Sequence, residues 1–359
     1  MENKEKILTL KRNKIIVHLC GGCAANLCEK AIKELRFLGE GFAEFEFSFI
    51  DTSRNNYDSI EQVGPLFEIK RKATSLKTEI SGSGGDRAQN AYDAMLNIPD
   101  YLESLRITKR ETGVYHLVVS SASGGSGSII SAFLVETLMQ KNIPVIALMV
   151  GDSSDALKLR NTQSSLSTLS KKAVSMGKCL LTHYINNADM GSSLTGNEDK
   201  ANAKIKSALT ILALFLSGQN DDIDQADMNN FINQHDYKGL SIPAGIYTLS
   251  YHSGNTDITL PDYTVPSVAR TLRVGNEDVN FNLDVLHHKV GRILSENAIN
   301  IMGNNLPVHI VASNGLLKEE MKRLTEANEK SAQRQKDLVN CNLEAAKHAV
   351  YDDELGIDL

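Results

Sequence analysis

Residues 114–140 read VYHLVVSSASGGSGSIISAFLVETLMQ, and this stretch decides the expected fold. It contains a β-rich apolar run, a glycine- and serine-rich loop, and an apolar helical pattern. A strand that passes through such a loop into a helix is typical of doubly wound α/β domains, which bind ligands at the carboxyl ends of parallel strands. Glycines allow close backbone approach, and successive N–H groups at a helix start attract anions. The stretch therefore predicts a phosphate-binding loop on a mostly parallel sheet.

The segments around this loop show the same alternation of strand and helix. Two further glycine loops, at residues 20–26 and 82–87, each stand directly before a helical pattern. One glycine loop is weak evidence, but three on one α/β domain indicate a polyphosphate that is bound from several sides. None of the loops supplies the lysine of a Gly-x-x-x-x-Gly-Lys-Ser/Thr motif, and none is a complete Gly-x-Gly-x-x-Gly fingerprint. Further strands of this domain are expected at residues 15–19, 45–50 and 143–150, and helices from residue 25 and at 88–96.

The second half of the chain changes character after a helical pattern at residues 198–216, which is apolar on nearly every side toward its end. Such a helix is expected between two bodies rather than on a surface. The region beyond it predicts a smaller α+β domain, and a long polar helix then follows at 316–350, expected to pack along the body. In that smaller domain, strands are expected at 246–251, 257–260 and 308–312, and helices at 265–274 and 282–298. The predicted boundaries are 1–196 for a nucleotide-binding domain, 197–217 for a central helix, 218–315 for the smaller domain and 316–359 for a C-terminal helix with an acidic tail.

Composition excludes several classes of protein. The 359 residues include 38 basic and 44 acidic side chains, so the formal net charge is −6, which argues against direct binding of nucleic acid. No apolar run reaches the length of a membrane helix. Five cysteines in a chain of this length do not indicate a secreted disulfide framework. A cytoplasmic protein is therefore expected.

The glycine loops resemble those of the tubulin/FtsZ superfamily of GTPases. Residues 123–128 are similar to its signature [Ser/Ala/Gly]-Gly-Gly-Thr-Gly-[Ser/Ala]-Gly, with Ser126 in place of threonine, and residues 21–26 resemble the first FtsZ loop, a glycine run that ends in asparagine. Residues 82–87 resemble the loop that senses the γ-phosphate. The resemblance implies a site for GTP or GDP with Mg²⁺, whose direct protein ligands the sequence does not identify. The implied nucleotide-binding residues are Gly21, Gly22, Cys23, Asn26, Gly82, Ser83, Gly84, Gly85, Ser123, Gly124, Gly125, Ser126, Gly127, Ser128, Asn161 and Asn202.

An acidic loop after the apolar helix is the second strong signal. Its residues 222–227 read DIDQAD, and by themselves they fit either a solvated turn that caps the next helix or a functional loop. The FtsZ pattern at this place is Asn-x-Asp-x-x-Asp, which Asp224 and Asp227 match while Asp222 replaces the asparagine. In the family, this loop inserts into the nucleotide site of the next subunit. The resemblance therefore implies that Asp224 and Asp227 are catalytic.

The long C-terminal helix favours the plasmid and bacteriophage TubZ branch of this superfamily. The resemblance then implies a GTPase that assembles head to tail into filaments, which segregate DNA through a small adaptor of the TubR type bound to the C-terminal region. Three alternatives remain open from the sequence. They are another filament role in DNA positioning or division, a nucleotide-binding structural protein without catalysis, and an NAD(P)-dependent oxidoreductase with Asp51 on the ribose.

Overall fold

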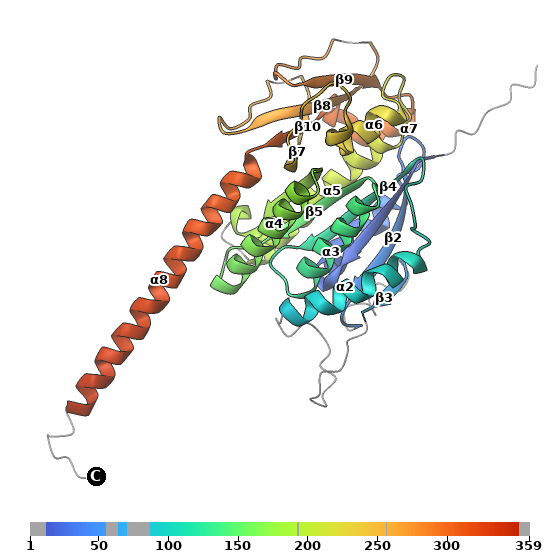
Figure 1. The fold of residues 1–359 in the computed structure, drawn as a ribbon. Helices are drawn as coiled ribbons and strands as arrows, with labels where there is room; N and C mark the ends of the chain where they lie inside the picture. Colours follow the sequence, from blue (N-terminus) through green and yellow to red (C-terminus); the bar gives the residue numbers. More distant parts are fainter. Residues whose placement is uncertain are drawn as a thin grey trace, which may run out of the picture.

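The computed structural model describes residues 12–54, 64–69, 87–191, 194–255, 257–276 and 278–351. Within them, ten strands form one continuous sheet (Figure 1). The strands are β1 (Lys14–Cys20), β2 (Glu44–Asp51), β3 (Leu66–Glu68), β4 (Val114–Ser121), β5 (Val145–Gly151), β6 (Cys179–Asn186), β7 (Gly245–Ser253), β8 (Val265–Arg273), β9 (His287–Arg292) and β10 (Val308–Asn314). The helices are α1 (Gly21–Leu35), α2 (Arg87–Ser104), α3 (Ser126–Gln140), α4 (Ala156–Ser175), α5 (Leu194–Leu216), α6 (Gln225–Ile232), α7 (Glu296–Met302) and α8 (Leu316–Tyr351), with short 3-10 turns at η1 (Asn187–Met190), η2 (Gln234–Asp236) and η3 (Gly303–Asn305).

The order of the strands confirms the predicted doubly wound fold. They run β3-β2-β1-β4-β5-β6-β7-β10-β8-β9 across the sheet, and the pairings from β3 through β7 are all parallel. Strand β10 pairs antiparallel with both β7 and β8. The order reverses at β1, whose neighbours are β2 and β4. In open α/β sheets, such a switch point opens a crevice at the carboxyl ends of the strands.

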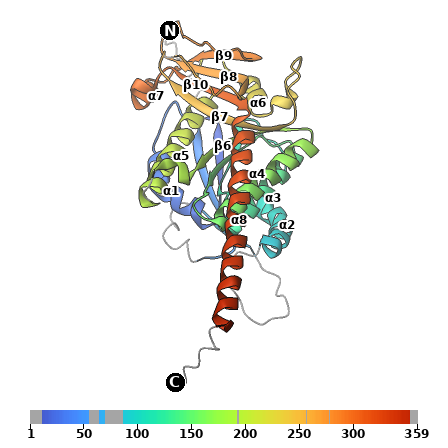
Figure 2. The ribbon, with the colours of Figure 1, turned by 90° about the vertical axis from the view of Figure 1, so that its left-hand side faces the viewer.

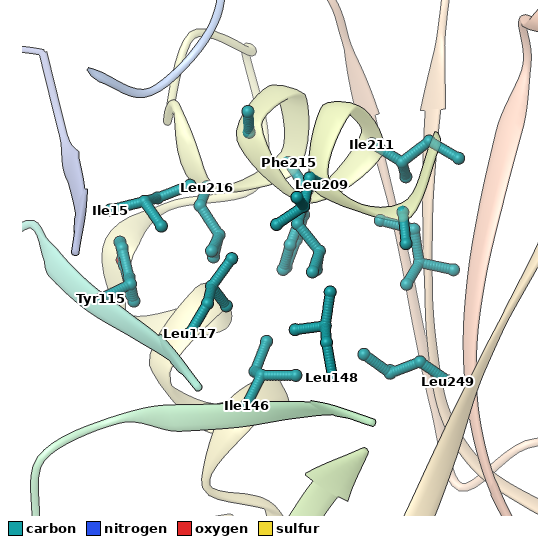
Figure 3. Packing of buried hydrophobic residues seen from close by; sticks show 14 of the residues in the cluster. Ile15, Tyr115, Leu117, Ile146, Leu148, Leu209, Ile211, Phe215, Leu216 and Leu249 are labelled. Carbon is teal, nitrogen blue, oxygen red and sulfur yellow. The ribbon is translucent and has the colours of Figure 1, made fainter. Parts of the chain in front are cut away.

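Helix α5 joins the parallel and antiparallel parts of the sheet, as its apolar sequence predicts. Its side chains Leu209, Phe215 and Leu216 are buried and lie against side chains of β1, β4, β5 and β7 (Figure 3). The other face of the parallel sheet is covered by α2, α3 and α4 (Figure 1). Because truncating a buried leucine costs about 2–5 kcal/mol, this packing holds α5 firmly in place. The packing of α5 therefore fixes the positions of the segments that precede and follow it.

The C-terminal helix α8 extends far beyond the rest of the described chain (Figures 1 and 2). Its first turns pack on α4, where Leu317 and Leu324 are buried and Gln163 donates a hydrogen bond to Thr325. Further along, Leu338 and Val339 are exposed. The predicted helix is thus present, but the expectation that it packs along the body holds only for its first part. No helix in the described ranges is long and apolar enough to cross a membrane.

Three predicted elements of the smaller domain are wrong. A helix is predicted at residues 265–274, yet residues 265–273 form strand β8. This strand lies between β10 and β9 and is buried on both faces, so the alternation typical of a half-exposed strand is missing. Residues 257–260 form no strand, and the expected helix at 282–298 is replaced by an irregular segment, strand β9 and the start of α7.

Candidate functional site

The candidate site lies where β1 and β4 run directly into helices. Strand β1 ends at Cys20 and α1 begins at Gly21, while α3 begins at Ser126, five residues after β4 ends. The predicted glycine loops are therefore shorter than expected, because residues 21–26 and 126–128 form the first turns of helices. Both helices start at the same edge of the sheet, so their unpaired N–H groups and positive dipole ends converge. Such a place favours a phosphate group.

The two glycine segments touch each other through their backbones. Gly21 has a φ of +79°, a left-handed conformation that favours glycine. A Cβ atom at Gly21 would lie 2.8 Å from the Cα atom of Gly127 and 2.9 Å from its nitrogen. Glycine at both positions therefore allows the starts of α1 and α3 to pack together.

A cavity of about 410 Å³ opens over these helix starts. Its size suits a nucleotide, since small-molecule pockets are typically about 300–1,000 Å³. The predicted binding residues that line it are Gly21, Gly22, Cys23, Asn26, Gly124, Gly125, Ser126, Gly127 and Asn202. Among the described residues that line the cavity none is a lysine or an arginine, so these residues would hold an anion chiefly through backbone N–H groups.

Besides Ser121 at the end of β4, two polar residues on the wall of the cavity are absent from the predicted set. Asn187 begins η1 after β6, and Glu198 lies one helical turn before Asn202 on α5. The side-chain oxygen of Asn187 is buried and makes no hydrogen bond to any described residue. A signal for both was present, because β6 also ends at this edge of the parallel sheet and residues four apart share a helix face.

Three predicted residues support the loop instead of lining the cavity. The Asn161 side chain donates a hydrogen bond to the carbonyl of Ser123 at 3.1 Å, and the Ser128 hydroxyl donates one to the carbonyl of Gly124 at 2.6 Å. The hydroxyl groups of Ser121 and Ser123 lie 2.9 Å apart. These bonds fix the backbone of residues 121–128 in the absence of a ligand. The predicted residues Gly82, Ser83, Gly84 and Gly85 lie outside the described residues.

A buried histidine pair lies on strands β1 and β4, close to the site. His18 and His116 have ring nitrogens 2.9 Å apart, and the other ring nitrogen of His18 lies 2.7 Å from the hydroxyl of Tyr101. Burial lowers the pKa of His116 to about 4, and burial followed by the charge of His116 holds the pKa of His18 well below its ordinary value. Both rings are therefore neutral at pH 7.

The predicted catalytic acids lie in a turn that caps helix α6. The Asp224 carboxylate accepts a hydrogen bond from the backbone N–H of Asp227 at 2.8 Å, and the Asp227 carboxylate accepts one from the N–H of Asp224 at 3.2 Å. This reciprocal arrangement is a capping box. Asp227 also forms an ion pair with Lys289 on β9, with 2.5 Å between the charged atoms. The capping interpretation of these residues is thus correct, and it leaves open what else the carboxylates do.

The acidic turn and the cavity lie at opposite ends of α5. The cavity contacts Glu198 and Asn202 near the start of the helix, whereas the helix ends at Leu216, whose carbonyl accepts a hydrogen bond from Asn13 at the beginning of β1. Fourteen residues separate Asn202 from Leu216, and at 1.5 Å per residue this is about 21 Å along the axis. The structure therefore does not bring Asp224 and Asp227 to the cavity of their own chain.

No cluster of three or more metal-ligating side chains occurs among the described residues. Two cysteines lie three positions apart at the start of α1, where Cys20 is buried and Cys23 is exposed on the cavity wall. Burial raises the pKa of the Cys20 thiol, which disfavours its reactive thiolate form. The sequence alternative of a ribose-binding Asp51 gains no support, because this residue does not line the cavity and its carboxylate accepts a hydrogen bond from the N–H of Thr52.

No family model matches the sequence. A phage tubulin-like protein from Pseudomonas phage phiKZ is 24% identical over 239 residues, which span 65% of this chain and 67% of that protein. The solved structure of the phage tubulin PhuZ with GDP aligns with a TM-score of 0.72 at 18% identity and covers 90% of this chain and 92% of its own. A protofilament of TubZ from bacteriophage PhiKZ gives 0.70 at 19% identity, with 89% and 91% covered.

These similarities confirm the resemblance to the tubulin/FtsZ superfamily. The chain has the tubulin-like fold, with a glycine-lined cavity at the carboxyl edge of its parallel strands. Within that superfamily, the matches reported above are to phage tubulins.

Proposed function

We propose that this protein is a GTPase that assembles head to tail into filaments and hydrolyses GTP between subunits. The observation that carries the proposal is the separation of the glycine-lined cavity from the acidic turn by the length of α5. In a head-to-tail stack, the turn of one subunit meets the cavity of the next, and each subunit supplies half of two sites. Such an interface does not close on itself and generates an open polymer.

The cavity offers groups that suit each part of a guanine nucleotide. The N-termini of α1 and α3 would hold the phosphates through backbone N–H groups. Asn187, Glu198 and Asn202 also line the cavity and provide donors and acceptors, and the Glu198 carboxylate would accept hydrogen bonds from the N1 and N2 groups of guanine. The GDP in the PhuZ structure supports a guanine nucleotide as ligand.

The acidic turn would supply the chemistry of hydrolysis. Phosphoryl transfer depends on positioning and on stabilising charge more than on covalent catalysis. One of the two predicted catalytic acids, Asp224 or Asp227, would orient the attacking water and accept its proton, which is general-base assistance. Mg²⁺ would bind mainly through nucleotide phosphates and water, which fits the small number of protein ligands it usually needs. Monomers would then turn over GTP slowly.

For the biological role, we propose a filament of the TubZ type that moves or positions phage or plasmid DNA in the cytoplasm. The phage origin of the matched proteins supports this proposal, and so does the projecting part of α8, which is available for an adaptor of the TubR type. The net charge of −6 favours contact with DNA through such a basic partner. No observation favours direct contact with nucleic acid or membrane.

The proposal is tested by light scattering and phosphate release, with protein titrated against GTP·Mg²⁺ and ATP·Mg²⁺. We expect light scattering to increase with GTP·Mg²⁺ but not with ATP·Mg²⁺. Turnover of GTP per protein molecule should rise steeply above a critical protein concentration. Turnover that is independent of protein concentration would contradict the shared site. The absence of turnover with both nucleotides would instead favour a structural nucleotide-binding protein.

A further inference from the structure

The acidic turn, here residues 221–227, is bonded to strand β9 at both of its ends. At the first end, the side chains of Arg292 and Asp221 form an ion pair of 3.0 Å, and the backbone N–H of Arg292 donates to the Asp221 carboxylate at 2.7 Å. At the other end, the Lys289 ammonium lies 2.5 Å from an oxygen of Asp227. The turn is thus tied to the edge strand β9, outside the helix that it caps.

A second cation, Arg270, bonds to the backbone of Asp227. Arg270 on β8 is completely buried, and its guanidinium donates to the backbone carbonyl of Asp227 at 3.3 Å. The same guanidinium donates to the carbonyl of Ala269 and contacts a ring nitrogen of His287. These bonds tie the backbone at Asp227 to β8 through a guanidinium that is costly to bury without partners.

The two acids of the capping box consequently differ in their exposure and in the bonds that their carboxylates make. One oxygen of Asp227 accepts from both Lys289 and the N–H of Asp224, and only 15% of its side chain is exposed. Asp224 is exposed and uses one oxygen for the capping bond. Its second oxygen forms no bond with any other residue of the described ranges. Asp227 is therefore a structural anchor, and Asp224 presents a carboxylate oxygen to an approaching subunit.

We propose that Lys289 is a positioning residue for GTP hydrolysis, which fixes Asp227 and thereby directs the free oxygen of Asp224 into the site of the next subunit. This inference rests on the proposed function. In the assisted step, the water oxygen bonds to the γ-phosphorus as the bond from that phosphorus to the β–γ bridging oxygen breaks. The bridging electron pair remains on GDP, and the water proton passes to Asp224 and then to the released phosphate.

The charges around Asp227 give the inference a measurable signature. The groups that face this carboxylate are Lys289 and His287 on β9, Arg270 on β8 and Asp224 in the turn itself. Burial raises the pKa of Asp227, but the bonds from Lys289 and from the Asp224 backbone outweigh it, and the pKa is lowered overall. Without Lys289, Asp227 takes up a proton at higher pH, so the capping box loosens at a higher pH.

The test compares Lys289→Met and Lys289→Arg with the wild type and with Lys172→Met. Lys172 forms a partly buried ion pair with Glu136 on the opposite face of the sheet, so its substitution controls for the loss of an ion pair elsewhere. Turnover above the critical concentration is measured from pH 4 to 8, together with the affinity of unassembled protein for a fluorescent GTP analogue and the critical concentration itself.

We expect Lys289→Met to lower kcat roughly 10- to 100-fold, the range known for small misplacements of reacting groups. Nucleotide affinity should stay within about twofold of the wild type, and the acidic limb of the pH profile should move to higher pH. Lys289→Arg should recover most of the rate, and Lys172→Met should behave as the wild type does.

The inference is overturned if Lys289→Met keeps the wild-type kcat and pH profile, or if nucleotide affinity falls in parallel with kcat. If Lys289→Met fails to fold, Lys289→Gln takes its place, and a wild-type kcat and pH profile in that variant overturns the inference. A wild type without concentration-dependent GTP turnover would contradict the proposed function itself. The two failures are therefore distinguishable.

Discussion

The contact between Gly21 and Gly127 makes a sharp prediction about nucleotide binding. Substituting Gly21 by alanine places a methyl group 2.8 Å from the Cα atom of Gly127, a distance that real Cβ contacts do not adopt. Alanine at a φ of +79° also costs about 1–2 kcal/mol by itself. The new methyl group would clash with backbone atoms of Gly127, which cannot rotate away as a side chain can. The starts of α1 and α3 must therefore move apart. We expect a greater loss than the conformational cost alone.

A matched control separates these two effects. Gly177 also has a positive φ, of +65°, but a Cβ atom there meets nothing within 4 Å. Gly177→Ala should therefore show only the cost of about 1–2 kcal/mol, with nucleotide binding unchanged. Gly21→Ala should lose more free energy of unfolding in urea, and its affinity for a fluorescent GTP analogue should fall at least tenfold, because the N–H groups no longer converge. If Gly21→Ala binds the analogue as the wild type does, the assignment of the phosphate site is refuted.

Two further predictions concern titration and capping. Because the folded chain holds His116 at a pKa of about 4 against an ordinary 6.5, the unfolded chain takes up the proton first as the pH falls, and stability is lost between pH 6.5 and 4. Urea unfolding at pH 7.5 and pH 5 should therefore show about 2 kcal/mol more pH-dependent loss in the wild type than in His116→Gln, and equal losses would contradict this account. Asp224→Asn should keep the helix cap and lose GTP turnover, whereas Asp224→Ala should lose turnover and also about 1 kcal/mol of stability, measured by phosphate release and urea unfolding. Full turnover by Asp224→Asn would exclude a catalytic carboxylate at this position.

The parallel half of the fold could be predicted from the sequence because its signals are local. The glycine loops at residues 20–26 and 123–128 each stand between a β-rich run and a helix, and the carboxyl-edge rule then places these two loops together. The same rule should have identified Asn187, which follows β6 in the way that residues 21–26 follow β1. It was missed because a single asparagine lacks the composition of a glycine loop.

The antiparallel half was predicted less well because its strands take their identity from distant partners. Strand β8 is paired on both edges by β10 and β9, and its own residues do not identify those neighbours. The same limit applies to Lys289, whose position opposite Asp227 depends on the register of β8 with β9. The carboxylates of the acidic turn could be predicted from the sequence, but the cations that bond to them could not.

The acidic turn also shows why helix capping and catalysis cannot be separated by a sequence pattern. Two aspartates three residues apart form a capping box at the start of α6, and the same spacing matches the catalytic pattern of the superfamily. The two roles are compatible, because a cap fixes the backbone of the acids and uses only some of their oxygens. The Asp227 carboxylate forms an ion pair with Lys289, whereas Asp224 keeps an exposed oxygen. Both acids follow the end of α5 that lies away from the cavity. A carboxylate fixed in this way cannot act within its own subunit, so its use in hydrolysis requires a second copy of the chain.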